Sequence, residues 1–142
     1  MPEVDFHTGL SDLPGYACRL LRKAWRQGRQ IVVTGSSEQL QRLDSLLWTF
    51  DPDDFVPHAR LRRGEPIAEP LRRTPIWLAE VPEAAPPRDV LVNLGPDWPE
   101  AAAAFVRVIE LVGALPDAVE HGRRRWRQYL AAGFTPTRPQ SQ

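Results

Sequence analysis

The sequence from residue 30 onward contains an apolar run that ends in a polar turn, Gln30-Ile31-Val32-Val33-Thr34-Gly35-Ser36-Ser37. Its three consecutive β-branched apolar residues predict a strand that is covered on both faces, as in a parallel sheet. Ser36, followed by Gln39 three residues later, predicts a capping box at the start of a helix. A second buried strand is predicted at Val90-Leu91-Val92-Asn93-Leu94. Together these runs favour an α/β fold.

The segments before and after the strand at residues 31–33 also predict alternating strands and helices. Val4–His7 alternates apolar and polar residues, which predicts a short strand. The spacing of apolar residues predicts a helix over 13–27, with Pro14 in its first turn and Gly28 as its stop. The helix that follows Ser36 is expected to end at Asp51-Pro52.

The second half of the chain is richer in proline, and eight of the 15 prolines lie between residues 52 and 87. Phe55–His58 is predicted to be extended, 60–73 to be a loop, and Pro75–Leu78 to be a strand. Asp97 with Glu100 predicts a capped helix start, and this helix would run to Gly113. Its expected buried residues are Ala101, Phe105, Val108, Ile109 and Val112. A last helix is expected from Pro116 or Asp117 to Gly133.

This order of elements predicts one α/β domain over residues 1–134. The sheet is expected to be mainly parallel and flanked by helices, in a Rossmann-like arrangement. The remainder, residues 135–142, contains Pro, Thr, Ser and Gln and is expected to be a flexible tail.

Charge and composition exclude several classes of function. The 142 residues carry 18 basic and 18 acidic side chains, so a protein that coats nucleic acid through a net basic surface is not indicated. All of the basic residues except Lys23 are arginine, whose rigid fork of donors suits carboxylates and phosphates. A single cysteine, Cys18, and no signal-like or membrane-spanning run indicate a cytoplasmic protein with no membrane association.

No motif predicts catalysis, a cofactor or a metal. Thr34–Ser37 follows a strand and opens a helix, but it lacks the glycine-rich and Gly-Lys-Ser/Thr patterns that bind nucleotides. The three histidines do not have metal-ligand spacing, and Cys18 is expected to be a small buried side chain. Asp51, Asp53 and Asp54 are interpreted as a solvated turn.

Two segments look like surfaces for partners. In the first, 47–58, Trp48 lies about 135° from the centre of the helix's apolar stripe, so it is a candidate for an exposed anchor. In the second, the last helix carries Arg123, Arg124, Arg125 and Arg127 around Trp126. An apolar arc with an arginine border suits a carboxylate joined to an apolar group, or phosphate plus base. The opposite charges of the two segments predict two docking faces of opposite sign.

Several segments, in this order and spacing, resemble the chi subunit family of bacterial DNA polymerase III. They cover about residues 4–134 and are listed here: Gln27–Val33, Leu43-Asp44-x-x-Leu47-Trp48, Phe55–His58, Arg88–Leu94 and Tyr129-x-x-Ala132-Gly133-Phe134. The resemblance implies a non-enzymatic clamp-loader accessory subunit with a nucleotide-binding-like fold but no nucleotide site. It implies two protein partners, the psi subunit and the acidic, phenylalanine-terminated tail of single-stranded-DNA-binding protein, with DNA contacted only indirectly.

The resemblance also implies site residues. The psi-facing segment corresponds to Trp48, Phe55, Val56, Pro57 and His58. The tail-binding site corresponds to Val112, Val119, Arg123, Trp126 and Arg127, although Val119 stands where family members carry a lysine and Trp126 where they often carry a tyrosine. The chain is expected to be a monomer, or to form a 1:1 complex with psi. Two alternatives stay open, a nucleotide-dependent α/β enzyme and a direct binder of single-stranded nucleic acid.

Overall fold

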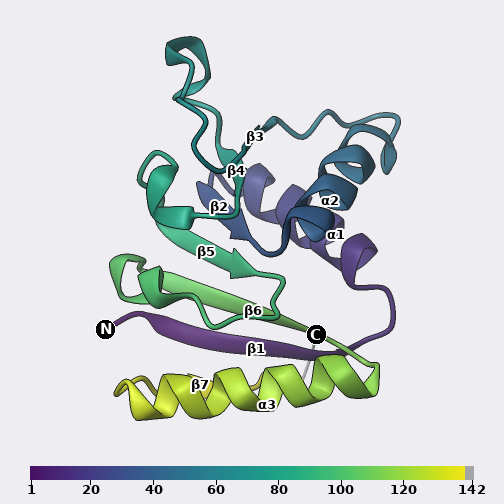
Figure 1. The fold of residues 1–142 in the computed structure, drawn as a ribbon. Helices are drawn as coiled ribbons and strands as arrows, with labels where there is room; N and C mark the ends of the chain where they lie inside the picture. The colour runs from purple at the N-terminus through teal and green to yellow at the C-terminus, as the bar shows by residue number, and fades with distance from the viewer. Residues whose placement is uncertain (140–142) are drawn as a thin grey trace.

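The apolar runs form the centre of a single parallel sheet in the computed structural model, which describes residues 1–139 (Figure 1). Within these residues the sheet has seven strands in the order β3-β4-β2-β5-β6-β1-β7, and every neighbouring pair is parallel. The strands are β1 (Glu3–Leu10), β2 (Ile31–Thr34), β3 (His58–Leu61), β4 (Ile76–Ala79), β5 (Val90–Asn93), β6 (Arg107–Gly113) and β7 (Pro136–Thr137). The predicted α/β class is therefore confirmed.

Helices α1 (Leu13–Arg26) and α2 (Ser37–Thr49) begin where the local sequence predicts. The Asp12 side chain accepts a hydrogen bond from the Gly15 amide at 3.1 Å, and Pro14 lies in the first turn of α1. At α2, Ser36 and Gln39 form the predicted capping box. The third helix, α3 (Pro116–Ala131), is confirmed as well.

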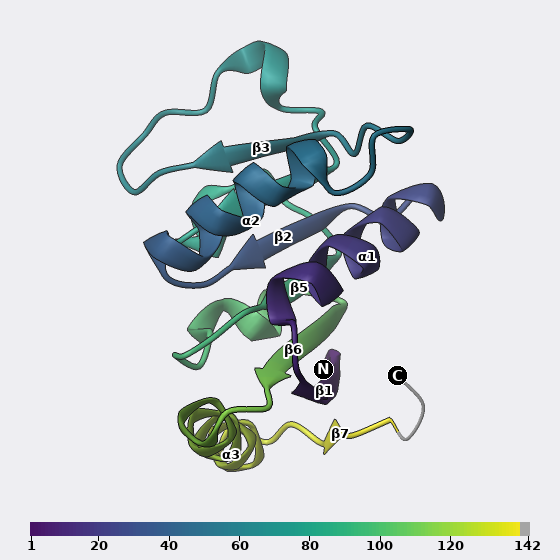
Figure 2. The same ribbon diagram turned by 90° about the vertical axis from the view of Figure 1, so that its right-hand side faces the viewer.

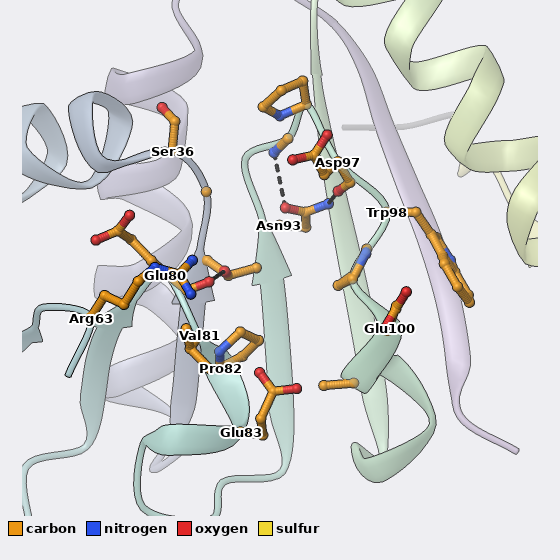
Figure 3. Close-up of a pocket in the computed structure, with 16 residues that line it drawn as sticks. Ser36, Arg63, Glu80, Val81, Pro82, Glu83, Asn93, Asp97, Trp98 and Glu100 are labelled. Atoms are coloured by element: carbon orange, nitrogen blue, oxygen red, sulfur yellow. Dashed lines mark hydrogen bonds between the residues drawn. The ribbon is translucent and has the colours of Figure 1, made fainter.

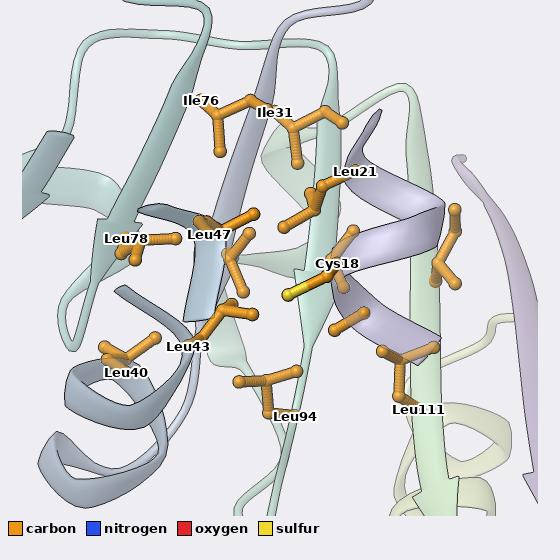
Figure 4. Packing of buried hydrophobic residues seen from close by; sticks show 14 of the residues in the cluster. Cys18, Leu21, Ile31, Leu40, Leu43, Leu47, Ile76, Leu78, Leu94 and Leu111 are labelled. Atoms are coloured by element: carbon orange, nitrogen blue, oxygen red, sulfur yellow. The ribbon is translucent and has the colours of Figure 1, made fainter. Parts of the chain in front are cut away.

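The two faces of the sheet are covered by different elements. Helices α1 and α2 lie on one face, whereas α3 lies near β6, β1 and β7 (Figure 2). Under α1 and α2, side chains from both helices pack on those of the strands, and Cys18 is buried among them as predicted (Figure 4). The other face carries aromatic residues and is closed by α3 and by the loops that contain the short 3₁₀ helices Pro82–Ala84 and Glu100–Ala104.

The helix predicted after Asp97 is wrong. The chain instead makes the short 3₁₀ helix and then strand β6, which lies between β5 and β1. Val108, Ile109 and Val112 fit a helical spacing, but β-branched residues also favour strands, and a short apolar run does not distinguish the two. The neighbouring strands decide the outcome, because β6 hydrogen-bonds on both edges and is buried on both faces.

Two boundaries also differ from the predictions. Strand β3 starts at His58, so the predicted extended piece Phe55–His58 reaches the sheet only at its last residue, and the predicted loop 60–73 begins with two strand residues. In the segment 135–142, which was expected to be a flexible tail, Pro136 and Thr137 pair with Val4 and Asp5 of β1. Residues 140–142 lie outside the described residues.

Candidate functional site

The residues predicted to bind an acidic tail lie around one cavity beside α3. The cavity has a volume of about 540 Å³ and is lined by residues from β1, β6, α3 and the segment after β7. We call it the tail cavity. Its lining contains all of the predicted positions, Val112, Val119, Arg123, Trp126 and Arg127, together with Phe6, Thr8, Gly9, Gly122 and Arg138.

The floor of the tail cavity is apolar. Phe6 and Val112 are buried on neighbouring strands, and Trp126 is half-buried with its ring edge-on to Phe6 at a centroid distance of 5.0 Å. Helix α3 comes close to β6 because Gly122 has no side chain. A Cβ at that position would lie 2.7 Å from Val112 Cγ1. The glycine therefore sets the depth of the cavity.

The rim of the tail cavity is basic. Arg123, Arg127 and Arg138 are exposed, and none of them forms an ion pair within residues 1–139. Arg123 and Arg127 are one helical turn apart, so their side chains share one side of α3. Unpaired guanidinium groups beside an apolar floor can hold a carboxylate while an attached apolar group fills the floor.

Arg125 has a different role from the other arginines of α3. It is 2% exposed, and its Nε donates to Glu110 Oε1 at 2.7 Å on the fully buried face of β6. The Tyr129 hydroxyl donates to Glu110 Oε2 at 2.6 Å, and the Asn93 amide donates to both carboxylate oxygens at 3.0 and 3.1 Å. Arg125 Nη1 also donates to the Pro96 carbonyl at 3.0 Å. This buried network ties α3 to β5 and β6.

The electrostatics of the network follow from its burial. Burial raises the pKa of the Glu110 carboxyl, and the charge of Arg125 with the donated hydrogen bonds opposes that shift. Burial and the neighbouring Glu110 charge raise the pKa of Tyr129, so its hydroxyl stays a donor. Sequence reasoning missed this network. The signal was an isolated acid in the apolar run 108–112, together with Arg125 and Tyr129 one turn apart on the last helix.

The segment predicted to face psi divides into exposed and buried residues. Trp48 is 56% exposed and Phe55 is 59% exposed, and their ring centroids are 5.3 Å apart. The ring centroids of His58 and Trp48 are 4.7 Å apart, and His58 Nδ1 donates to the Val56 carbonyl at 2.8 Å. Trp48 and Phe55 thus form an aromatic pair on the surface, which we call the aromatic patch.

Three predicted members of this segment are not part of the exposed pair. Val56 is fully buried in the core under α1 and α2, so a direct contact between its side chain and a partner is excluded in this conformation. His58 is 9% exposed, with Nε2 3.0 Å from an Asp44 carboxylate oxygen, and Pro57 is half-buried. Val56 and His58 hold the loop so that Phe55 meets Trp48.

The acidic turn after α2 is not a free negative surface. Arg22 of α1 pairs with Asp51 at 2.5 Å, and Arg26 pairs with Asp54. The Asp53 amide and then Arg22 hold the pKa of Asp51 below its usual value. The residues form a surface turn as predicted, with Asp53 exposed. Two of its three carboxylates are paired with arginines of α1, so the predicted docking face of negative sign is reduced.

A second pocket tests the nucleotide-dependent alternative. It has a volume of about 500 Å³ and lies at the carboxyl ends of β2, β4 and β5, where parallel sheets often bind nucleotides (Figure 3). Its lining has one basic residue, Arg63, and four carboxylates, Glu80, Glu83, Asp97 and Glu100. This charge does not favour a phosphate.

Two backbone amides at the start of α2, beside this pocket, are already bonded within the capping box. The Ser36 amide donates to Gln39 Oε1 at 2.9 Å, and the Gln39 amide donates to Ser36 Oγ at 3.2 Å. These are amide groups of the kind that hold phosphate at helix N-termini. Within residues 1–139, no group of three or more His, Cys, Asp or Glu is arranged to hold a metal ion, and no helix is long and apolar enough to cross a membrane.

Comparison with known proteins assigns the chain to a family. The family described as "DNA polymerase III chi subunit, HolC" matches residues 1–137. The chain belongs to this family. The match confirms the resemblance seen in the sequence. It spans the aromatic patch, α3 and every lining residue of the tail cavity except Arg138.

Curated members of the chi subunit family match over most of their length. The DNA polymerase III subunit chi of Pseudomonas aeruginosa is 34% identical over 139 residues, which cover 94% of this chain and 93% of that protein. The subunit of Escherichia coli K12 is 29% identical over 128 residues and that of Haemophilus influenzae 32% over 119 residues. These cover 89% and 83% of this chain and 84% and 80% of those proteins.

Solved structures with a similar fold are distant in sequence. Domain 2 of the DEAD-box helicase Mss116p, bound to an RNA duplex, superposes with a TM-score of 0.63 at 7% identity and covers 100% of this chain and 65% of that one. The C-terminal domain of Saccharomyces cerevisiae Dbp5, bound to Gle1 and IP6, gives a TM-score of 0.56 at 8% identity and covers 98% and 90%. At this identity the likeness extends to the parallel α/β fold alone, which this chi family member shares.

Proposed function

We propose that this chi family member is a non-catalytic adaptor of the DNA polymerase III holoenzyme, acting in the bacterial cytoplasm during DNA replication. It links the clamp loader, through psi, to the C-terminal tail of single-stranded-DNA-binding protein. The observation that carries the proposal is the tail cavity, where an apolar floor and exposed, unpaired arginines meet on one side of α3. That combination matches a peptide that ends in phenylalanine and is acidic upstream.

The binding mode follows from the geometry of the tail cavity. The terminal ring fills the floor formed by Phe6, Val112 and the edge of Trp126. Arg123 holds the terminal carboxylate by charge-assisted hydrogen bonds, with Arg127 one turn away on the same side. Val119 adds an apolar contact rather than a charge.

Titration of a short acidic peptide ending in phenylalanine tests this site. We expect binding that weakens with salt and falls about tenfold or more in Arg123→Ala, because a charge-assisted hydrogen bond is lost. Arg124→Ala is the matched control, since Arg124 is an exposed arginine of the same helix outside the cavity lining. Failure of the unaltered protein to bind, or equal effects of the two variants, would contradict the site.

The aromatic patch is proposed as the psi-binding surface. Trp48 and Phe55 offer large rings that are more than half exposed, and such aromatic anchors carry much of the binding energy at interfaces. Co-purification of psi with the unaltered protein, and its loss with Trp48→Ala or Phe55→Ala, supports this surface. Retention of psi by both variants would contradict it.

Direct binding to single-stranded DNA is the competing function. The exposed arginines of α3 beside Trp126 are compatible with it, whereas the zero net charge of the chain argues against it. A gel shift with free oligonucleotide, without single-stranded-DNA-binding protein, separates the two. A shift at the concentrations where the acidic peptide binds would favour direct DNA binding over the adaptor.

A further inference from the structure

The segment that follows β7 brings an additional arginine to the tail cavity. Arg138 belongs to the last part of the described chain, yet it lines the cavity together with residues of β1, β6 and α3. It is exposed and directly follows β7, the edge strand that pairs with β1, so it reaches the cavity from a different element than the arginines of α3. It can therefore meet a different part of a bound peptide.

Arg138 is held in place by the residues before it. Phe134 is 6% exposed and packs edge-on against Tyr129 at a centroid distance of 5.3 Å. Pro136 is buried, and the Thr137 hydroxyl donates to Asp5 Oδ1 at 2.7 Å. The backbone is thus fixed up to the residue preceding Arg138, so the guanidinium group stays near the cavity at a modest cost in conformational entropy.

Within residues 1–139, no carboxylate pairs with Arg138. On the neighbouring strand β1, the Asp5 side chain is already bonded to Arg107 at 2.7 Å and to Thr137. The charge of Arg138 is available to an anionic ligand, as are those of Arg123 and Arg127 on the other side of the cavity.

The two basic sides suit different parts of a peptide. A terminal carboxylate is a single group, and Arg123 with Arg127 already supplies two guanidinium forks for it on α3. Arg138 comes from the segment after β7 and not from α3, so it is placed to meet the residues that precede a peptide end held on α3. We infer that Arg138 is a binding residue for the acidic side chains upstream of the terminal phenylalanine, and this inference rests on the proposed function of the tail cavity.

A double-mutant cycle between protein and peptide tests this assignment. The protein variants are Arg138→Ala, Arg123→Ala and the control Arg124→Ala. The peptides are a short sequence with aspartates before a C-terminal phenylalanine, the same sequence with asparagines in their place, and the same sequence with an amidated C-terminus. Affinities come from calorimetric titration at low and high salt, and thermal unfolding checks that each variant is folded.

We expect Arg138→Ala to weaken binding of the aspartate peptide about two- to fivefold, as for an exposed ion pair, and more at low salt than at high salt. The same variant should have little effect on binding of the asparagine peptide. It should weaken binding of the amidated peptide by the same factor as binding of the aspartate peptide. Arg123→Ala should show the reverse dependence, on amidation and not on the aspartates.

The outcomes separate the two proposals. If the unaltered protein does not bind the aspartate peptide, the proposed function fails and this role of Arg138 fails with it. If it binds but Arg138→Ala behaves like Arg124→Ala, the cavity stands and only the role of Arg138 is overturned. If Arg138→Ala responds to amidation instead of to the aspartates, Arg138 binds the terminal carboxylate and the assignment made here is wrong.

Discussion

Arg125 of α3 donates to Glu110 of β6 across 2.7 Å, and both side chains are almost completely shielded from solvent. Arg125 also donates to the Pro96 carbonyl in the loop that follows β5, so the pair joins α3 to the carboxyl ends of the central strands. It fixes the rotation of α3, and the neighbouring residues Arg123 and Arg127 therefore point to the cavity.

Removing one partner of this pair should be costly. Arg125→Ala leaves the Glu110 charge buried without its cation, and such changes destabilise proteins by about 3–5 kcal/mol. We expect a loss of this size in the free energy of unfolding, measured by urea denaturation. Arg124→Ala is the control, because that side chain is exposed and should change stability by less than about 0.5 kcal/mol. Similar losses in the two variants would show that the buried pair does not hold α3.

Gly122→Ala tests the close approach of α3 to β6. In an exposed helix interior the change would stabilise the protein by up to about 1 kcal/mol. Here the new Cβ would lie 2.7 Å from Val112 Cγ1, and Val112 is buried and stiff. We expect destabilisation by about 1–3 kcal/mol from overpacking, together with weaker peptide binding as the cavity changes shape. Thermal unfolding measures the sign, with Glu120→Ala on the exposed side of α3 as control, and a stabilised Gly122→Ala protein would contradict the packing.

Stability should fall in mild acid through His7. Its Nδ1 lies 2.6 Å from the Tyr16 hydroxyl, and burial lowers the pKa of the ring below 6.5, with Asp5 opposing and Arg107 adding to the shift. As the pH drops, His7 therefore takes up a proton in the unfolded chain before it does so in the folded protein. The stability that the neutral, buried His7 ring provides is fully present above about pH 6.5, and it is lost as the pH falls toward the lower pKa of the folded state. Urea midpoints between about pH 7.5 and 5.5 should decline less in His7→Gln, and equal slopes for the two proteins would rule His7 out.

Local signals in the sequence were enough for much of the fold. Ile31–Val33 and Val90–Val92 became central strands, and Ser36 with Gln39 capped α2, because these features depend on residues that are close in the chain. Strand β6 was missed because its apolar spacing also fits a helix. Its identity depends on β1 and β5, and these strands are contributed by distant parts of the chain.

The candidate site shows the same division. All of the residues predicted to bind the partner's acidic tail line one cavity. Arg138 was missed because residues 135–142 of this chain were expected to be flexible, and the position of Arg138 depends on the pairing of β7 with β1. Arg125 was taken for a border residue of the basic arc, since its partner Glu110 lies on another element. Contacts of this kind are visible only once the sheet is assembled.

The contrast between Trp48 and Val56 separates a binding role from a packing role. Val56 is completely buried, so Val56→Ala removes two methyl groups from the core and should cost about 2 kcal/mol of stability at about 0.8 kcal/mol per group. Trp48 is 56% exposed, and Trp48→Ala should change stability less while it abolishes binding of psi. Chemical denaturation and psi co-purification on both variants give the comparison, with Arg42→Ala on an exposed part of α2 as control. If Val56→Ala lost psi while keeping full stability, or Trp48→Ala kept psi while losing stability, the aromatic patch would be a packing feature and the interface would lie elsewhere.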